Sequence, residues 1–140
     1  MLFLTLKTLV TIKLFKMRKT INFLLALVII SLYSCSGSDT YRGLWKAINE
    51  RGEKFEITFD AKNFTVKDSS GQVKTYTYTQ NSVSIKNSVE NYGIKVSDGK
   101  DYRISFPVAN DETKGAIQDA TGRPIYIIDR SNYIKYEDVY

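Results

Sequence analysis

The sequence predicts an all-β fold, a single small antiparallel meander of about eight short strands, closed as a barrel or folded as a sandwich. Three observations support this prediction beyond residue 40. Apolar residues recur with a period near two, turn-forming residues interrupt them about every eight to twelve positions, and β-branched and aromatic residues are dense. No long amphipathic helix and no internal repeat is detected there. An N-terminal helical segment is expected ahead of the β region.

The first alternating segments lie between residues 55 and 68. Phe55, Ile57 and Phe59 alternate with polar residues, which is typical of a strand with one face toward water. A turn then precedes the next strand around Val66. These two segments predict an antiparallel hairpin.

The strongest strand and hairpin signals lie in the middle of the chain. In the segment 73–80, Tyr76 and Tyr78 fall on one face and threonines on the other, a composition that favours a strand over a helix. The Asp-Gly sequence within residues 97–100 is the strongest short-range hairpin signal in the chain. Tyr102 begins the strand that follows it.

The last third of the chain continues the pattern with shorter segments. Pro107 falls near the end of its strand, where a missing N–H is tolerated. Short strands are expected around Ile117 and over 125–129, and a polar, tyrosine-bearing segment is expected over 131–140. Together these segments complete the predicted meander.

The net charge of +5 does not belong to the predicted β domain. Of the 20 Lys and Arg residues, five precede Cys35, and the remaining 15 balance the 15 Asp and Glu residues. No cluster of basic residues remains that could neutralise several neighbouring phosphates. We therefore expect no nucleic-acid partner.

The residue counts also bear on catalysis. The chain has no histidine, so it lacks the usual general base near neutral pH and the commonest ligand of zinc, copper or iron. Its one cysteine excludes an internal disulfide. The acidic residues cluster in predicted turns, where they serve turn geometry and solvation, and none has the spacing of a calcium loop. We expect a protein that is not an enzyme, with no catalytic residue, no metal and no cofactor.

A targeting pattern precedes the β region. Residues 17–20 form a short basic cluster, and residues 21–32 form an apolar stretch that ends just before Cys35. A run of about 13 apolar residues is shorter than the roughly 20 needed to span a bilayer, but it suits the apolar region of a signal peptide. A buried apolar helix with an incidental cysteine is the alternative.

The segment Leu32-Tyr33-Ser34-Cys35 resembles the lipobox of bacterial lipoproteins. That resemblance implies cleavage before Cys35, diacylglyceryl transfer to its sulfur and further acylation, for example with palmitate. It divides the chain into a signal peptide (1–34), a lipidated tether (35–40) and a β domain (41–140). A translation start at Met17 would shorten the leader. Because serine follows the cysteine, the resemblance favours the outer membrane of the cell envelope, with the periplasmic or surface side left open.

A second, shorter resemblance lies at the start of the β domain. Gly43-Leu44-Trp45 is similar to the Gly-x-Trp that opens lipocalin-like β-barrels, in which the tryptophan packs across the barrel floor. This resemblance implies a barrel rather than a sandwich. An ordinary core tryptophan on the first strand is the alternative.

The aromatic residues are the best candidates for contacts with a ligand or partner, because an aromatic face stacks while a hydroxyl bonds at the edge. Half-buried strand tyrosines without a binding role are the alternative. The leading hypothesis is a membrane-anchored, non-enzymatic binding or interaction module. A structural lipoprotein subunit of an envelope or secretion assembly, and an inhibitor or immunity lipoprotein, are the alternatives. The candidate contacts are Trp45, Tyr76, Tyr78, Tyr126, Tyr133 and Tyr136.

These hypotheses require different surfaces. A ligand-binding protein needs an apolar cavity of roughly 300 Å³ or more with a few polar groups. A protein partner is favoured by a filled interior together with an exposed apolar patch or an unpaired edge strand.

The lipobox leads to a direct prediction. Substitution Cys35→Ala removes the only sulfur that can accept a lipid, so the variant should lose its acyl chains and leave the membrane fraction. Fractionation and intact-mass measurement of the wild type and the variant test this. A wild-type mass without acyl chains, together with unchanged fractionation of the variant, would contradict the anchor.

Overall fold

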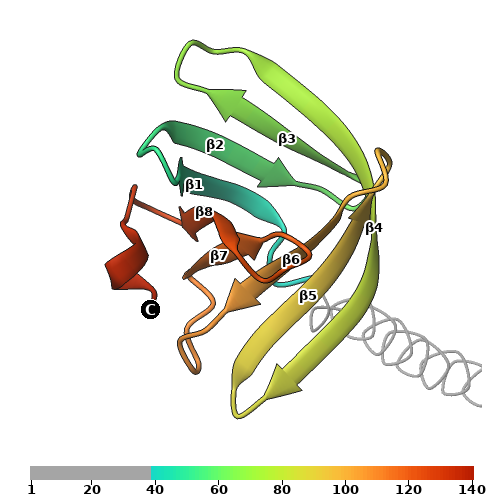
Figure 1. Cartoon of the computed structure of the whole chain (residues 1–140), viewed down its shortest axis with the longest axis vertical. Helices are drawn as coiled ribbons and strands as arrows, with labels where there is room; N and C mark the ends of the chain where they lie inside the picture. The colour runs from blue at the N-terminus through green and yellow to red at the C-terminus, as the bar shows by residue number, and fades with distance from the viewer. Residues whose placement is uncertain (1–38) are drawn as a thin grey trace, which may run out of the picture. The chain divides into compact units, whose positions relative to one another are not determined.

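Eight antiparallel strands close into a small barrel (Figure 1). The computed structural model describes residues 39–140, so the expected signal segment and Cys35 lie outside the described residues. Within the described part, no helix is long and apolar enough to cross a membrane. The elements are β1 (Gly43–Asn49), β2 (Lys54–Phe59), β3 (Asn63–Asp68), β4 (Val73–Lys86), β5 (Val89–Val96), β6 (Asp101–Phe106), β7 (Lys114–Gln118), β8 (Pro124–Asp129) and the 3₁₀ helix η1 (Tyr136–Asp138).

The strands follow the chain order around the barrel. Each strand pairs with the next, and β1 pairs with β8, with Lys46 opposite Asp129 and Asn49 opposite Tyr126. The prediction of an all-β antiparallel meander is confirmed. Of the two closures that the sequence allowed, the barrel is the one formed.

The period-two pattern places the core inside the barrel. In β2, Ile57 and Phe59 are buried while Thr58 between them is exposed. In β5, Ile94 and Val96 are buried on either side of an exposed lysine. Alternation therefore separates an apolar interior from a wet exterior along these strands.

The two ends of the barrel differ. We call the end that contains Tyr41, Trp45 and Arg130 the closed end. We call the opposite end, where the tight hairpin turns gather, the open end. The open end carries the turns at 50–53, 69–72, 97–100 and 119–123.

An arginine seals the closed end. The Arg130 guanidinium lies 3.6 Å from the centre of the Trp45 ring, an arrangement that gives a cation–π attraction. The Arg130 Nη1 and Nη2 atoms donate hydrogen bonds to the Leu44 and Thr40 carbonyl oxygens, at 3.1 and 2.7 Å. The Trp45 Nε1 in turn donates to the Tyr41 carbonyl at 2.6 Å. These bonds tie the segment before β1 to the residue that follows β8.

Aromatic rings fill the interior behind this seal. The ring centre of Tyr41 lies 5.4 Å from that of Phe59 and 5.1 Å from that of Tyr92. Trp45 lies 5.6 Å from Phe106. Contacts of this kind contribute packing energy beyond the burial of area. Aromatic side chains therefore fill the interior at the closed end of the barrel.

β4 runs farther than the sequence predicted. The expected strand at 73–80 continues through a bulge between Gln80 and Ser82 to Lys86, which makes one strand of 14 residues. Its first part pairs with β3 and its second part with β5. The partner changes between Thr77 and Tyr78, and the bulge lies farther along, within the part that pairs with β5. There the extra residue bends the strand.

The C-terminal segment is less polar in its contacts than the sequence predicted. Within the expected polar segment 131–140, Val139 is buried and packs with Ile134 against Ala116 and Ile127. This segment covers the outside of β7 and β8 (Figure 1). Ile134 and Val139 are five residues apart, a spacing that gives no strand or helix periodicity in the sequence. Their burial is therefore visible only in the tertiary structure.

Gly115 allows β6 and β7 to approach closely, which leads to a prediction. A Cβ at this position would overlap the Ser105 carbonyl oxygen and lie 2.8 Å from the Phe106 ring. The Ser105 carbonyl belongs to the backbone of β6 and cannot rotate away as a side chain can. Gly115→Ala should therefore lower the free energy of unfolding by about 1–3 kcal/mol. Chemical denaturation measures this loss.

Gly93→Ala is the matched control. The three atoms nearest to its Cβ would belong to the side chains of Ser82 and Asn81, which can rotate aside. Alanine is also preferred over glycine in a strand, so the control should lose less stability than Gly115→Ala. An equal loss in both variants would argue against the close approach of the backbones.

Candidate ligand-binding cavity

The open end of the barrel contains a cavity of about 240 Å³. Every strand from β2 to β8 and two of the turns contribute to its wall. The lining residues are Phe55, Ile57, Phe59, Phe64, Val66, Asp68, Gln72, Lys74, Tyr76, Ile94, Asp98, Lys100, Tyr102, Ile117, Ile125 and Tyr126.

The inner part of the cavity is apolar and aromatic. The buried aliphatic side chains of Ile57, Ile94 and Ile117 form its floor, and the half-buried Val66 lies in its wall. In the wall, the Phe55 and Tyr126 rings meet edge to face at 5.3 Å, and Tyr76 lies against the Phe64 ring at 5.0 Å. Rings held by other rings give a preformed apolar surface.

Three tyrosines surround the polar part of the cavity. Tyr76, Tyr102 and Tyr126 come from β4, β6 and β8 and all line it. Burial is the main cause that raises the pKa of Tyr102 and Tyr126, and the charge of Tyr76 adds to both shifts. Among residues 39–140, none of the three hydroxyls has a hydrogen-bond partner. They can donate to or accept from a bound molecule.

Charged residues stand at the mouth. The Asp68 Oδ1 accepts hydrogen bonds from the Ser70 and Gln72 backbone N–H groups at 3.0 Å, and the bond from the Ser70 hydroxyl is the largest cause that lowers the pKa of Asp68. Asp98 Oδ1 accepts from the Lys100 N–H at 3.0 Å. Both carboxylates thus shape the turns that carry them.

The side chains of the two lysines at the mouth differ from those of the two aspartates, which bond to their turns. Lys74 and Lys100 line the cavity, and neither forms an ion pair within residues 39–140. Their ammonium groups are exposed and solvated. The mouth therefore offers charges of both signs above an apolar floor.

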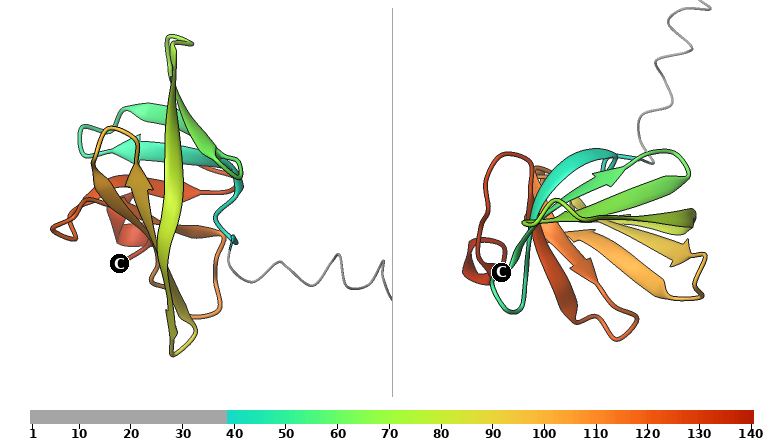
Figure 2. Two further views of the ribbon diagram at one scale, coloured as in Figure 1. Left: turned by 90° about the vertical axis from the view of Figure 1, so that its right-hand side faces the viewer. Right: turned by 90° about the horizontal axis from the view of Figure 1, so that it is seen from above.

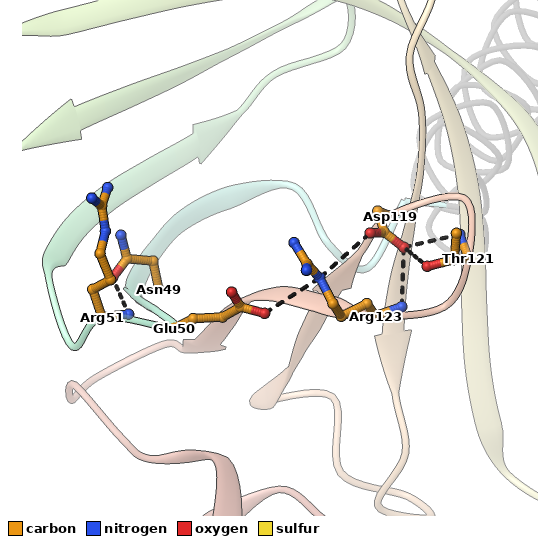
Figure 3. Close-up of polar contacts among 6 residues, drawn as sticks. All are labelled: Asn49, Glu50, Arg51, Asp119, Thr121 and Arg123. Carbon is orange, nitrogen blue, oxygen red and sulfur yellow. Dashed lines mark hydrogen bonds and ion pairs between the residues drawn. The ribbon is translucent and has the colours of Figure 1, made fainter.

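Polar contacts also link two neighbouring turns of the open end (Figure 3). Arg123 Nε lies 3.3 Å from a Glu50 carboxylate oxygen and 3.7 Å from one of Asp119. Asp119 in turn accepts hydrogen bonds from the Thr121 hydroxyl and from the Arg123 backbone N–H. Exposed ion pairs stabilise little, but here they connect the β1–β2 turn to the β7–β8 turn across the barrel closure.

The structure separates the residues that the sequence singled out. Tyr76 and Tyr126 lie together at the cavity. Trp45 is fully buried at the closed end under Arg130, and Tyr78 is buried with its hydroxyl donating to the Asp60 carbonyl oxygen. Trp45 and Tyr78 are therefore core residues in this structure.

The remaining two candidates lie on the outside of the barrel. The Tyr133 ring is 5.2 and 5.1 Å from the Lys46 and Lys54 ammonium nitrogens. Tyr136 is exposed on η1 and stacks on Tyr140 at 4.9 Å. Neither contributes to the cavity.

Two cavity residues, Phe55 and Tyr102, were missed as candidates. The alternation placed both on the apolar face of a strand, but this face becomes a cavity wall only when β2, β6 and β8 converge. The arrangement can hold a small apolar body and hydrogen-bond its polar group. Within the described part of the chain, no group of three His, Cys, Asp or Glu side chains is placed to hold a metal ion.

No protein family, no curated protein and no solved structure matches this chain.

The tyrosine cluster leads to a prediction for titration. Because Tyr76 adds to the raised pKa of Tyr102 and Tyr126, Tyr76→Phe should lower both values, while burial keeps them above about 10. Carbon-13 NMR titration of the tyrosine rings measures this. The matched control, Tyr136→Phe, removes an exposed hydroxyl and should leave both values unchanged.

The same shifts fix the sign of the stability change. A phenol with a raised pKa in the folded state contributes stability below about pH 10, and this contribution is lost as the pH rises above that value. A wild-type protein whose Tyr102 and Tyr126 titrate like free tyrosine would contradict the burial of these hydroxyls.

Proposed function

We propose that this protein is a membrane-anchored, non-enzymatic binding module that takes a small amphipathic molecule into the open end of its barrel. The observation that carries the proposal is the cavity, which combines an apolar floor with the hydroxyls of Tyr76, Tyr102 and Tyr126. The lipobox at Cys35 supports the anchor. Polar groups that converge above an apolar surface are typical of small-molecule sites.

The volume limits the ligand. The cavity of about 240 Å³ is smaller than the roughly 300 Å³ expected above for a ligand-binding protein, which restricts it to ligands below drug size. Its volume equals that of about eight waters in the liquid. It suits a single ring or a short acyl chain. The apolar end would enter first, with the polar group among the tyrosines and any charge near Lys74 or Lys100.

One observation favours the alternative of a protein partner in an envelope assembly or an inhibitory complex. The second part of β4 pairs only with β5, and Val83 and Ile85 on it are exposed. Unpaired edges are templates for a further strand. The bulge beside Gln80 interrupts this edge, so we place the binding role in the cavity.

Two probes test the cavity, octanoate for a short acyl chain and 4-ethylphenol for a single polar ring. Saturation-transfer NMR should show binding to the wild type. Val66→Phe should occupy part of the cavity from its wall and weaken the binding of both probes at least several-fold. Val73→Phe is the matched control, because Val73 is exposed at the start of β4, and it should bind both probes like the wild type.

A hydroxyl deletion tests the polar part separately. Tyr126→Phe should weaken 4-ethylphenol about two- to tenfold, the effect of one neutral hydrogen bond. Failure of both probes to bind the wild type, or equal binding by the wild type and Val66→Phe, would overturn the proposed cavity role.

A further inference from the structure

The hairpin of β4 and β5 extends beyond the barrel at its closed end (Figure 2). We call residues 81–91 the projecting hairpin. All side chains from Thr79 to Lys86 are exposed, so this part of β4 covers no core. Val83 and Ile85 are exposed to 43% and 55%. A strand that alternates apolar and polar residues without burying them presents a free apolar face.

The register shows which face this is. Val83 lies opposite Tyr92 and Ile85 opposite Glu90. Tyr92 points into the barrel, where it is buried, and directly opposed residues of an antiparallel pair share a face. Val83 and Ile85 therefore continue the inner face of the sheet past the closed end.

The projecting hairpin is held in place by its neighbours. Asn87 and Ser88 adopt the left-handed conformation that a tight two-residue turn requires. The Asn110 N–H donates a hydrogen bond to the Ser88 carbonyl oxygen at 3.0 Å, and Glu90 pairs with Phe106 in β6. The apolar face is thus presented in a fixed position.

The chain enters the β domain beside the base of this hairpin. The Thr40 Oγ1 lies 3.1 Å from the Tyr92 hydroxyl, and the Tyr41 hydroxyl donates to the Gln80 side chain at 2.9 Å. Cys35 precedes Asp39 by four residues. Even fully extended, that segment spans at most about 14 Å. A lipid on Cys35 would therefore keep the closed end near the bilayer.

We propose that the projecting hairpin contacts the lipid surface, with Val83 and Ile85 inserted at the level of the headgroups. The inference rests on the proposed anchor at Cys35. Apolar side chains that insert at the interface increase the membrane affinity that the acyl chains provide. The open end and its cavity then face the aqueous side.

The tether argues against a second copy paired along the β4 edge. If the β4 edges of two copies paired antiparallel, the two closed ends would point in opposite directions. Tethers of at most about 14 Å could not then both reach one bilayer. Nearby charges have both signs, with Lys86 and Glu90 on the hairpin and the ion pair of Arg42 with Asp39 at its base. Zwitterionic lipid should suffice.

Fluorescent labels on the full, lipidated protein in phosphatidylcholine vesicles test the contact. Because Cys35 is the only native cysteine and is acylated, Ile85→Cys provides a single free thiol for an environment-sensitive dye. With vesicles, the dye should emit at a shorter wavelength than in detergent-free buffer without vesicles. Iodide should then quench its fluorescence much less. Val73→Cys, on the same strand at the open end, should remain quenched.

The outcomes separate the hairpin from the anchor. Wild-type protein that carries acyl chains and floats with vesicles, while position 85 stays as exposed as position 73, overturns the hairpin contact and leaves the anchor intact. Protein without acyl chains that does not float overturns both. A wavelength shift at position 85 that grows with protein concentration in the absence of vesicles shows a second copy on this face and overturns the lipid contact.

A charge substitution gives an independent readout. Two proteins carry the dye at Lys86→Cys, one with Val83 and Ile85 unchanged and one with Val83→Asp and Ile85→Asp. The vesicle-induced wavelength shift seen in the first should be mostly lost in the second. Both positions are exposed, so folding should be preserved, which circular dichroism checks. An undiminished shift would contradict the role of the two apolar side chains.

Discussion

The structure depends on the closure of β8 onto β1, which converts a meander with two free edges into a barrel. Arg130 secures this closure at one end, because its guanidinium covers the Trp45 ring and also bonds to the carbonyl oxygens of Leu44 and Thr40. These contacts join residues about ninety positions apart. Closure removes the free edges that β1 and β8 would otherwise leave.

The closure has different consequences at the two ends. At the closed end, large rings such as Trp45, Tyr41 and Phe106 fill the interior. At the open end, the rings of Tyr76 and Tyr126 remain at the wall and leave space between them. A small barrel has volume for either a full core or one small ligand. Here the core occupies one half and the cavity the other.

This division matches the direction of the chain. The residues that lead toward Cys35 enter at the closed end, next to Gln80 and Tyr92. In the proposed arrangement, the solid half of the barrel and the exposed pair Val83 and Ile85 lie near the bilayer. The hollow half then faces the solvent from which a small molecule would arrive. One short tether thus relates the anchor, the hairpin and the cavity.

The sequence by itself determined the strand pattern, the absence of histidine and the balance of charge beyond Cys35. It also placed Tyr76 and Tyr78 on the apolar face of one strand, because side-chain direction follows from period-two alternation alone. The tertiary structure decided that Tyr78 fills the core while Tyr76 meets Tyr102 and Tyr126 at a cavity. It also decided the barrel closure and the burial of Val139. Periodicity fixes which face a residue occupies, whereas its neighbours depend on pairings between strands far apart in the chain.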